Sequence, residues 1–229
     1  MDLKLEGRKA IVTGGTGGIG RSTAELLAAE GCDVGVCARG RQGVEETVSR
    51  LEARGAQAFG RALDVADGDA LRGWVQGAAE ALGGLDVVVA NVSALGSGEG
   101  EEEWRRAVDV DLMHTVRTVE ASLPHLRGSD APAIVLVSTV SAREPQSAGA
   151  YGTVKAALNH YGKALASSLA PDGIRVNVVS PGTIYVEDGF WGNVERQDPE
   201  GFRQVLEANP MGRMGEPAEV ARAIAFLAS

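Results

Sequence analysis

The chain is poor in aromatic residues, in cysteine and in positive charge. Aromatic residues make up 4% of its 229 residues, and it contains two cysteines. Two cysteines cannot build the disulfide framework of a small secreted domain. Acidic residues outnumber Lys and Arg by 31 to 22, which gives a formal net charge of -9. Because such a chain repels phosphate groups and anionic lipid surfaces, we expect it to bind neither nucleic acid nor membranes.

Long apolar stretches and metal-binding patterns are also missing. No run reaches the roughly 18 apolar residues of a membrane span, and the first residues, MDLKLEGRKA, have no apolar signal-peptide region. The three histidines have no metal-ligand spacing with one another or with either cysteine. The sequence therefore predicts a cytoplasmic protein without a metal site.

Glycine, in contrast, is abundant. The chain has 31 glycines, near twice the usual share of about 7%, which indicates tight turns or close backbone approaches. A hydrophobic fraction of 44% in 229 residues is enough for a large core. We expect one domain over residues 1–229.

Short apolar runs alternate with longer segments of helical periodicity. We expect strands at residues 9–13, 33–37, 58–63, 85–90, 133–138 and 175–180. We expect helices at residues 21–30, 44–54, 70–82, 102–126, 148–169 and 216–228, with a kink at Pro124 in the fourth. The alternation predicts a Rossmann-type, doubly wound parallel sheet in a three-layer α/β/α arrangement. Ligands of such sheets bind beyond the carboxyl ends of the strands.

The first predicted strand runs into the glycine-rich segment TGGTGGIG at residues 13–20, just before a helix. Glycines let the backbone approach a pyrophosphate, and the start of the helix favours the anion. The alternative is a merely flexible turn. The residues expected to contact a dinucleotide here are Gly14, Thr16, Gly18, Ile19 and Gly20.

The ends of the next three strands carry further candidate cofactor contacts. Where NAD-binding folds often have an acidic residue, this chain has Arg39. Arg39, with Arg41, could pair with a 2′-phosphate, which favours NADP(H) over NAD(H); the alternative is a solvated surface arginine. Asp64 could accept from the adenine amino group, with Val65 against the ring, and Asn91 follows the fourth strand.

The fifth strand ends at Ser138, and Tyr151 and Lys155 follow in the next helix. Tyr151 and Lys155 are one turn apart and share a helix face. An ammonium beside a phenol favours the phenolate, so we expect the pKa of Tyr151 to fall from about 10 toward neutrality. Tyr151 could then exchange a proton with a substrate oxygen that Ser138 holds, while a bound nicotinamide supplies a hydride. A tyrosine and a lysine with this spacing occur in many helices. The prediction of a catalytic site therefore rests on their combination with the residues at the other strand ends.

At this point the chain resembles the short-chain dehydrogenase/reductase family, in its single-domain branch, over nearly its whole length. The segment at 13–20 matches the family's Thr-Gly-xxx-Gly-x-Gly cofactor motif, and Ser138, Tyr151 and Lys155 match its catalytic triad. Residues 181–184, PGTI, match the family's Pro-Gly turn. Residues 209–213 and 216–220 resemble 3-oxoacyl-[acyl-carrier-protein] reductases in particular. The resemblance implies a cofactor contact at Ile184 and a homotetramer or homodimer.

The chain departs from the family pattern in three places. Residues 90–93, ANVS, stand where the family has Asn-Asn-Ala-Gly, so Ser93 replaces a glycine. Asp111 stands where the family has a catalytic asparagine whose main chain holds a proton-relay water; the resemblance implies the same role for its carbonyl. The chain ends at residues 226–229 within the last predicted helix, so we expect the final family strand to be absent.

These observations predict an NADP(H)-dependent oxidoreductase that interconverts a small-molecule ketone and a secondary alcohol, such as a 3-oxoacyl thioester. The alternatives are a dehydrogenase of a sugar, polyol or steroid alcohol, and a dinucleotide-binding sensor without turnover. The irregular stretch at 181–199 carries Tyr185, Phe190 and Trp191 and is expected to be a lid over a partly apolar substrate; the alternative is a surface loop. Arg143 is a candidate contact for a substrate carboxylate or a carrier phosphate.

Overall fold

A computed structural model describes residues 2–95, 100–144 and 148–229. Its six strands form one sheet in the order β3-β2-β1-β4-β5-β6, and every neighbouring pair is parallel. The strands are β1 (Lys9–Thr13), β2 (Asp33–Ala38), β3 (Ala58–Ala62), β4 (Val87–Ala90), β5 (Ala133–Val137) and β6 (Arg175–Val179). The predicted doubly wound sheet is confirmed. The strand order reverses between β1 and β4, which is where sheets of this kind bind ligands.

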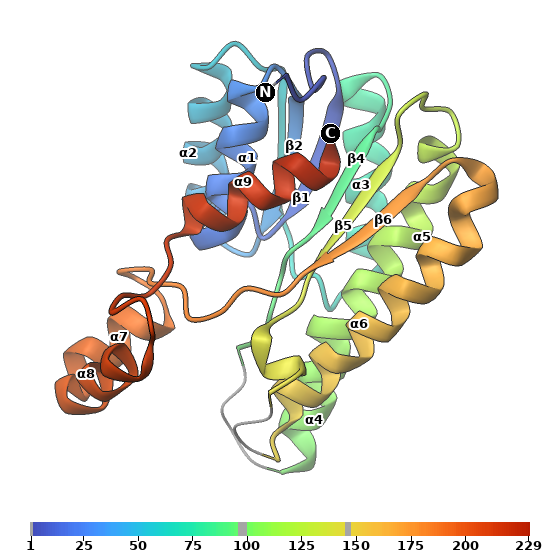
Figure 1. The fold of residues 1–229 in the computed structure, drawn as a ribbon. Coiled ribbons are helices and arrows are strands. Elements are labelled where there is room, and N and C mark those ends of the chain that lie inside the picture. The colour runs from blue at the N-terminus through green and yellow to red at the C-terminus, as the bar shows by residue number, and fades with distance from the viewer. Residues whose placement is uncertain (1, 96–99, 145–147) are drawn as a thin grey trace.

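Helices cover both faces of the sheet (Figure 1). One face carries α1 (Gly18–Ala29), α2 (Arg41–Glu52) and α9 (Pro217–Ala228). The other face carries α3 (Gly68–Leu82), α5 (His114–Leu126) and α6 (Ala150–Leu169). None of these helices, nor any other within the described ranges, is both long and apolar enough to cross a membrane.

The central strands explain why the sheet lies inside the molecule. Every residue of β4 (VVVA) and β5 (AIVLV) is buried, as expected for parallel strands covered on both faces. Alternate side chains enter two cores. Val88, Ile134 and the fully buried Trp74 belong to the core under α3, α5 and α6, whereas Val87 and Val135 join the core under α1 and α9.

The helix predicted over 102–126 is interrupted. Helix α4 (Glu101–Ala107) passes into a π-helical turn, η1 (Val108–Met113), before α5 begins. Pro124 lies inside α5, which continues to Leu126, so the irregularity falls at η1. Such π turns insert one extra residue per turn and are frequent at functional sites, and η1 buries the side chain of Asp111 in the interior.

The stretch expected to be an irregular loop at 181–199 contains a helix, α7 (Phe190–Gln197), and α8 (Pro199–Ala208) follows it. Asp198 starts α8 by accepting the backbone N–H of Gly201, and Pro199 takes the first helical position. A Cβ at Gly192 would lie 1.8 Å from the Glu187 carbonyl oxygen, so α7 packs on the preceding backbone through a glycine. Both helices stand away from the two helical layers (Figure 1).

Candidate active site

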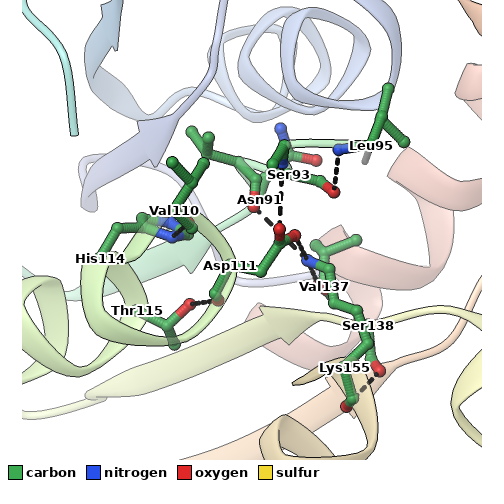
Figure 2. Close-up of polar contacts among 12 residues, drawn as sticks. Asn91, Ser93, Leu95, Val110, Asp111, His114, Thr115, Val137, Ser138 and Lys155 are labelled. Atoms are coloured by element: carbon green, nitrogen blue, oxygen red, sulfur yellow. Dashed lines mark hydrogen bonds and ion pairs between the residues drawn. The ribbon is translucent and has the colours of Figure 1, made fainter. Parts of the chain in front are cut away.

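The polar residues predicted at the strand ends gather at the carboxyl edge of β1, β4 and β5. The glycine-rich segment follows β1, Asn91 follows β4, and Ser138 follows β5. Helix α6, which carries Tyr151, brings Lys155 to the same edge. The turn η1 brings Asp111 beside Lys155 (Figure 2).

Two glycines of the segment at 13–20 are required by close packing. Gly14 has a φ of +67°, and a Cβ at this position would lie 3.0 Å from Val92 Cγ2. A Cβ at Gly20 would lie 2.1 Å from the Gly14 carbonyl oxygen. Helix α1 starts with Gly17 as its N-cap, and no described side chain caps it. The uncapped N–H groups of the first turn therefore fit the pyrophosphate of a dinucleotide.

Asn91 fastens this glycine segment to the end of β4. Its backbone N–H donates to Thr13 Oγ1 at 2.9 Å, and its Nδ2 donates to the Thr13 carbonyl at 3.1 Å. Thr13 Oγ1 also lies 3.3 Å from Nε2 of the fully buried His114, whose Nδ1 lies 2.5 Å from the Val110 carbonyl. Burial lowers the pKa of His114 to about 3, and the charge of Lys155 adds to this. His114 is therefore a neutral support of the site.

Lys155 and Asp111 form a buried ion pair. Their side chains are 2% and 0% exposed, and Lys155 Nζ lies 3.1 Å from Asp111 Oδ1. The ammonium also donates to the carbonyls of Val137 at 3.1 Å and Val92 at 3.4 Å. Asp111 Oδ2 accepts the backbone N–H of Ala94 at 3.1 Å. The Asp111 side chain thus joins α6 to the segment that follows β4 (Figure 2).

The pKa of Tyr151 does not behave as the sequence predicted. Burial raises this pKa, and the charge of Asp111 raises it further, whereas hydrogen bonds with Thr139 and Ser93 oppose the rise. The prediction that this pKa falls toward neutrality is therefore wrong, because burial, together with the charge of Asp111, outweighs the effects that lower it.

Ser138 is buried at the end of β5, and its Oγ donates to the Lys155 carbonyl at 3.1 Å. Its hydroxyl oxygen can still accept a hydrogen bond. The backbone carbonyl of Asp111, expected to hold a water, accepts from Thr115 Oγ1 at 3.1 Å. Ser93 and Thr139 were not predicted as hydrogen-bond partners of Tyr151. The only signals for them were the position of Thr139 directly after Ser138 and the replacement of a glycine by Ser93.

The candidate adenosine contacts lie at the ends of β2 and β3. Arg39 is exposed directly after β2, whereas Arg41 Nε pairs with Glu45 Oε1 at 2.8 Å. Asp64 is exposed, with Oδ1 accepting the backbone N–H of Ala66 at 2.9 Å, and Val65 is buried. Arg39 is thus the better placed of the two predicted arginines, since Arg41 already has an acidic partner.

The segment before α7 lies over the glycine-rich segment. Ile184 bridges to Gly215, and a Cβ at Gly18 would lie 3.3 Å from Val186 Cγ2. The Tyr185 hydroxyl donates to Glu195 Oε2 at 2.6 Å. Phe190 stays 45% exposed. Val186 therefore lies beside the glycine-rich segment, whereas the predicted lid residues Phe190 and Trp191 lie in α7 instead of a loop. Arg143 is exposed just after the 3-10 turn η2 (Val140–Ala142).

Comparison with known proteins gives matches over almost the whole chain. A family model described as "Enoyl-(Acyl carrier protein) reductase" matches residues 14–229. Isoepoxydon dehydrogenase patN of Penicillium expansum is 36% identical over 230 residues, which cover 98% of this chain and 89% of that protein. The structure of L-sorbose reductase from Gluconobacter frateurii, in complex with NADPH and L-sorbose, has a TM-score of 0.91 at 29% identity and covers 100% of this chain and 92% of that one. A structure of NAD+-bound xylitol dehydrogenase has a TM-score of 0.91 at 26% identity, and the match covers 99% of this chain and 94% of that one.

Proposed function

This chain belongs to the short-chain dehydrogenase/reductase family, and from that premise we propose that it reduces a partly apolar ketone to a secondary alcohol with NADPH. It is an oxidoreductase that uses a nicotinamide dinucleotide. The observation that carries the proposal is that Lys155 contacts Ser138 and Val92, that Val92 lies against Gly14 of the glycine-rich segment, and that Tyr151 is one turn before Lys155 in α6. When bound, the reduced nicotinamide supplies the hydride.

The roles of the side chains follow from their chemistry. The Tyr151 hydroxyl donates a proton to the substrate oxygen, and Ser138 Oγ orients that oxygen. Lys155 contributes its charge beside Tyr151 and is the candidate donor to the nicotinamide ribose. Asn91 keeps the glycine-rich segment in the geometry that a pyrophosphate needs.

The preference for NADP(H) rests on Arg39. A guanidinium suits a 2′-phosphate because its planar donors match phosphate oxygens. Arg39 is exposed after β2, and within the described residues it has no acidic partner. Ile184, Asp64 and Val65 are proposed to complete the cofactor contacts. Relatives of this fold bind either cofactor, as the NADPH complex of L-sorbose reductase and the NAD+ complex of xylitol dehydrogenase illustrate.

The substrate class is proposed from apolar side chains exposed in the segments that follow β4 and β6. Leu95 is 54% exposed after β4, and Phe190 is 45% exposed at the start of α7. Large exposed apolar side chains beside an active site favour an apolar portion in the ligand. A cyclic ketone or a 3-oxoacyl thioester fits this better than a free sugar. A homodimer or homotetramer and a cytoplasmic location remain predictions from the family resemblance.

The testing experiment follows NADPH absorbance with a panel of cyclic ketones, 3-oxoacyl thioesters and ketoses, with NADH in parallel. We expect turnover with NADPH on ketones that carry an apolar portion. Turnover of ketoses alone would move the substrate class to sugars and polyols. Tight NADPH binding without turnover of any ketone would favour a dinucleotide-binding sensor over a ketone reductase.

A further inference from the structure

The buried polar side chains of α5 differ in where their hydrogen bonds go. Thr115, Thr118 and Ser122 donate their hydroxyl hydrogens to carbonyls one turn earlier along the chain. His114 bonds backwards through Nδ1 only, and its Nε2 lies 3.3 Å from Thr13 Oγ1 at the end of β1. Among the described contacts of these four side chains, that of His114 is therefore the one that joins α5 to the start of the glycine-rich segment.

The position of the hydrogen on the His114 ring follows from its neighbours. The Val110 carbonyl, 2.5 Å from Nδ1, can only accept, so Nδ1 carries a hydrogen (Figure 2). Burial lowers the pKa of His114 to about 3, so the ring is neutral at pH 7 and has a single N–H group. Nε2 is therefore an acceptor, and Thr13 Oγ1 donates to it.

The Thr13 hydroxyl connects His114 to Asn91. Its one hydrogen has two acceptors nearby, Nε2 at 3.3 Å and the Val89 carbonyl at 3.5 Å. Without this hydrogen, Nε2 would have no donor among the described residues, and an unpaired buried acceptor costs free energy. The Asn91 N–H, which can only donate, meets the same hydroxyl oxygen at 2.9 Å. One hydrogen-bond relay therefore runs from the Asn91 N–H through Thr13 and His114 into η1.

This relay ends on the segment that the cofactor needs. Thr13 is the last residue of β1, and Asn91 Nδ2 donates to the carbonyls of Thr13 at 3.1 Å and Gly14 at 3.5 Å. A Cβ at Gly20 would lie 2.5 Å from the same nitrogen. Asn91 thus touches both the start of the glycine-rich segment and the first turn of α1. A shift of Thr13 or Asn91 would move the backbone N–H groups that suit a pyrophosphate.

We propose that His114 is a positioning residue for the dinucleotide: as the Nδ1–H tautomer it accepts the Thr13 hydroxyl hydrogen and so fixes the glycine-rich segment before the cofactor binds. Such preorganisation raises affinity because the segment need not be ordered on binding. His114 is fully buried, so it acts through Thr13 and not by contact with the dinucleotide. This role rests on the dinucleotide cofactor and is independent of the ketone proposed above.

The first test determines the tautomer on the protein without cofactor. Nitrogen NMR of the imidazole rings at pH 7 distinguishes a protonated ring nitrogen from an unprotonated one. The chain has three histidines, and the signals of His114 are those that remain when His125 and His160 are replaced by Gln. We expect a hydrogen on Nδ1 and none on Nε2. A hydrogen on Nε2, or a charged ring at pH 7, would overturn the proposal.

The second test measures the Kd of NADPH and of NADH by fluorescence titration. His114→Phe removes both ring nitrogens, and Thr13→Val removes the hydroxyl. Each variant should raise both Kd values by roughly 3- to 10-fold, the usual effect of one hydrogen bond. Thr13→Ser keeps the hydroxyl and should restore the original values. His114→Asn retains a donor near Val110 but no acceptor for Thr13, and it covers the case in which the phenylalanine variant does not fold.

Thr118→Val is the matched control. It also removes a buried hydroxyl, but one that donates to the His114 carbonyl within α5, so both Kd values should stay unchanged even if Tm falls. Because His114 and Thr13 act through one bond, His114→Phe combined with Thr13→Val should raise Kd no further than either change alone.

Three results would refute this role of His114. They are an unchanged Kd in folded His114 and Thr13 variants, additive effects in the double variant, and weaker binding of NADPH alone. The last would place the effect at the 2′-phosphate and not at the glycine-rich segment, which both dinucleotides share. If the unaltered chain binds NADPH but reduces no ketone, the proposed function fails, yet the titrations still decide the role of His114.

Discussion

At the scale of single residues, the proposed proton donor is one phenol hydroxyl, that of Tyr151. Tyr151→Phe removes the Oη atom and leaves the ring, so packing around α6 should persist. We expect kcat to fall by about 10²–10⁴-fold, the usual contribution of general acid catalysis, while NADPH still binds. Stopped-time assays of kcat and a fluorescence titration of NADPH check both parts. A variant with turnover close to that of the unaltered chain would remove Tyr151 from the role of proton donor.

A second residue-scale prediction concerns Arg39 and the choice of cofactor. Hydrogen bonds to a charged group contribute about 1.5–3 kcal/mol, which corresponds to roughly a 10- to 100-fold change in affinity. Arg39→Ala should therefore raise the Kd of NADPH by that factor and leave the Kd of NADH nearly unchanged. Arg41→Ala is the control, because Arg41 is paired with Glu45. If only the Arg41 variant weakened NADPH binding, the 2′-phosphate contact would belong to that residue.

At the scale of elements, the start of α1 depends on glycine at one position more than at another. A Cβ at Gly20 would lie 2.1 Å from the Gly14 carbonyl oxygen and 2.5 Å from Asn91 Nδ2, whereas a Cβ at Gly17 meets nothing within 4 Å. Gly17 has an extended φ of -155°, which any residue adopts. Gly20→Ala should cost about 1–3 kcal/mol of overpacking, which lowers Tm by about 2–4 °C per kcal/mol in a chain of this size.

Calorimetry of the two alanine variants checks this difference. Gly17→Ala should keep Tm close to that of the unaltered chain, since its methyl group points into open space. If Tm fell equally in both variants, the contact between a Cβ at Gly20 and Gly14 would not explain the requirement for glycine. The requirement would then come from the helix start and the flexibility of the loop.

The elements also show where sequence patterns stop being informative. The strand ends could be predicted because β4 and β5 are continuous apolar runs, and this placed Asn91 and Ser138 correctly at one edge. Helix α7 was missed because FWGNVERQ is short and contains a mid-helix glycine, and glycine normally disfavours helix. The π turn at Val108–Met113 was also missed, because such single turns occur inside longer α-helices and interrupt their periodicity only locally.

The error about Tyr151 has a different origin. The spacing of Tyr151 and Lys155 is a local property and was predicted correctly. The pKa of Tyr151 is raised by burial and by the charge of Asp111, and Asp111 lies far from α6 in sequence although its Oδ1 is 3.1 Å from Lys155 Nζ. A charge effect is set by every charge within a few ångströms, so the sequence could identify the candidate groups but not their balance.

At the scale of the whole molecule, buried His114 makes stability depend on pH. Its pKa is about 3 in the folded chain because burial disfavours the imidazolium, against about 6.5 when unfolded. Between these values the unfolded chain binds more protons, so the free energy of unfolding rises with pH from about 3 to about 6.5 and falls on acidification. The contribution of this residue is on the order of a few kcal/mol over that window.

Replacing His114 should therefore change the slope of stability against pH as well as its level. His114→Gln loses the contacts with Thr13 and Val110 and should be less stable at pH 7, but its free energy of unfolding should change less between pH 7 and pH 4. His160→Gln, at an exposed position of α6, should keep both the level and the slope. Urea unfolding at a series of pH values measures the two quantities separately. Equal slopes in His114→Gln and the unaltered chain would show that carboxylates elsewhere, and not this histidine, govern acid unfolding.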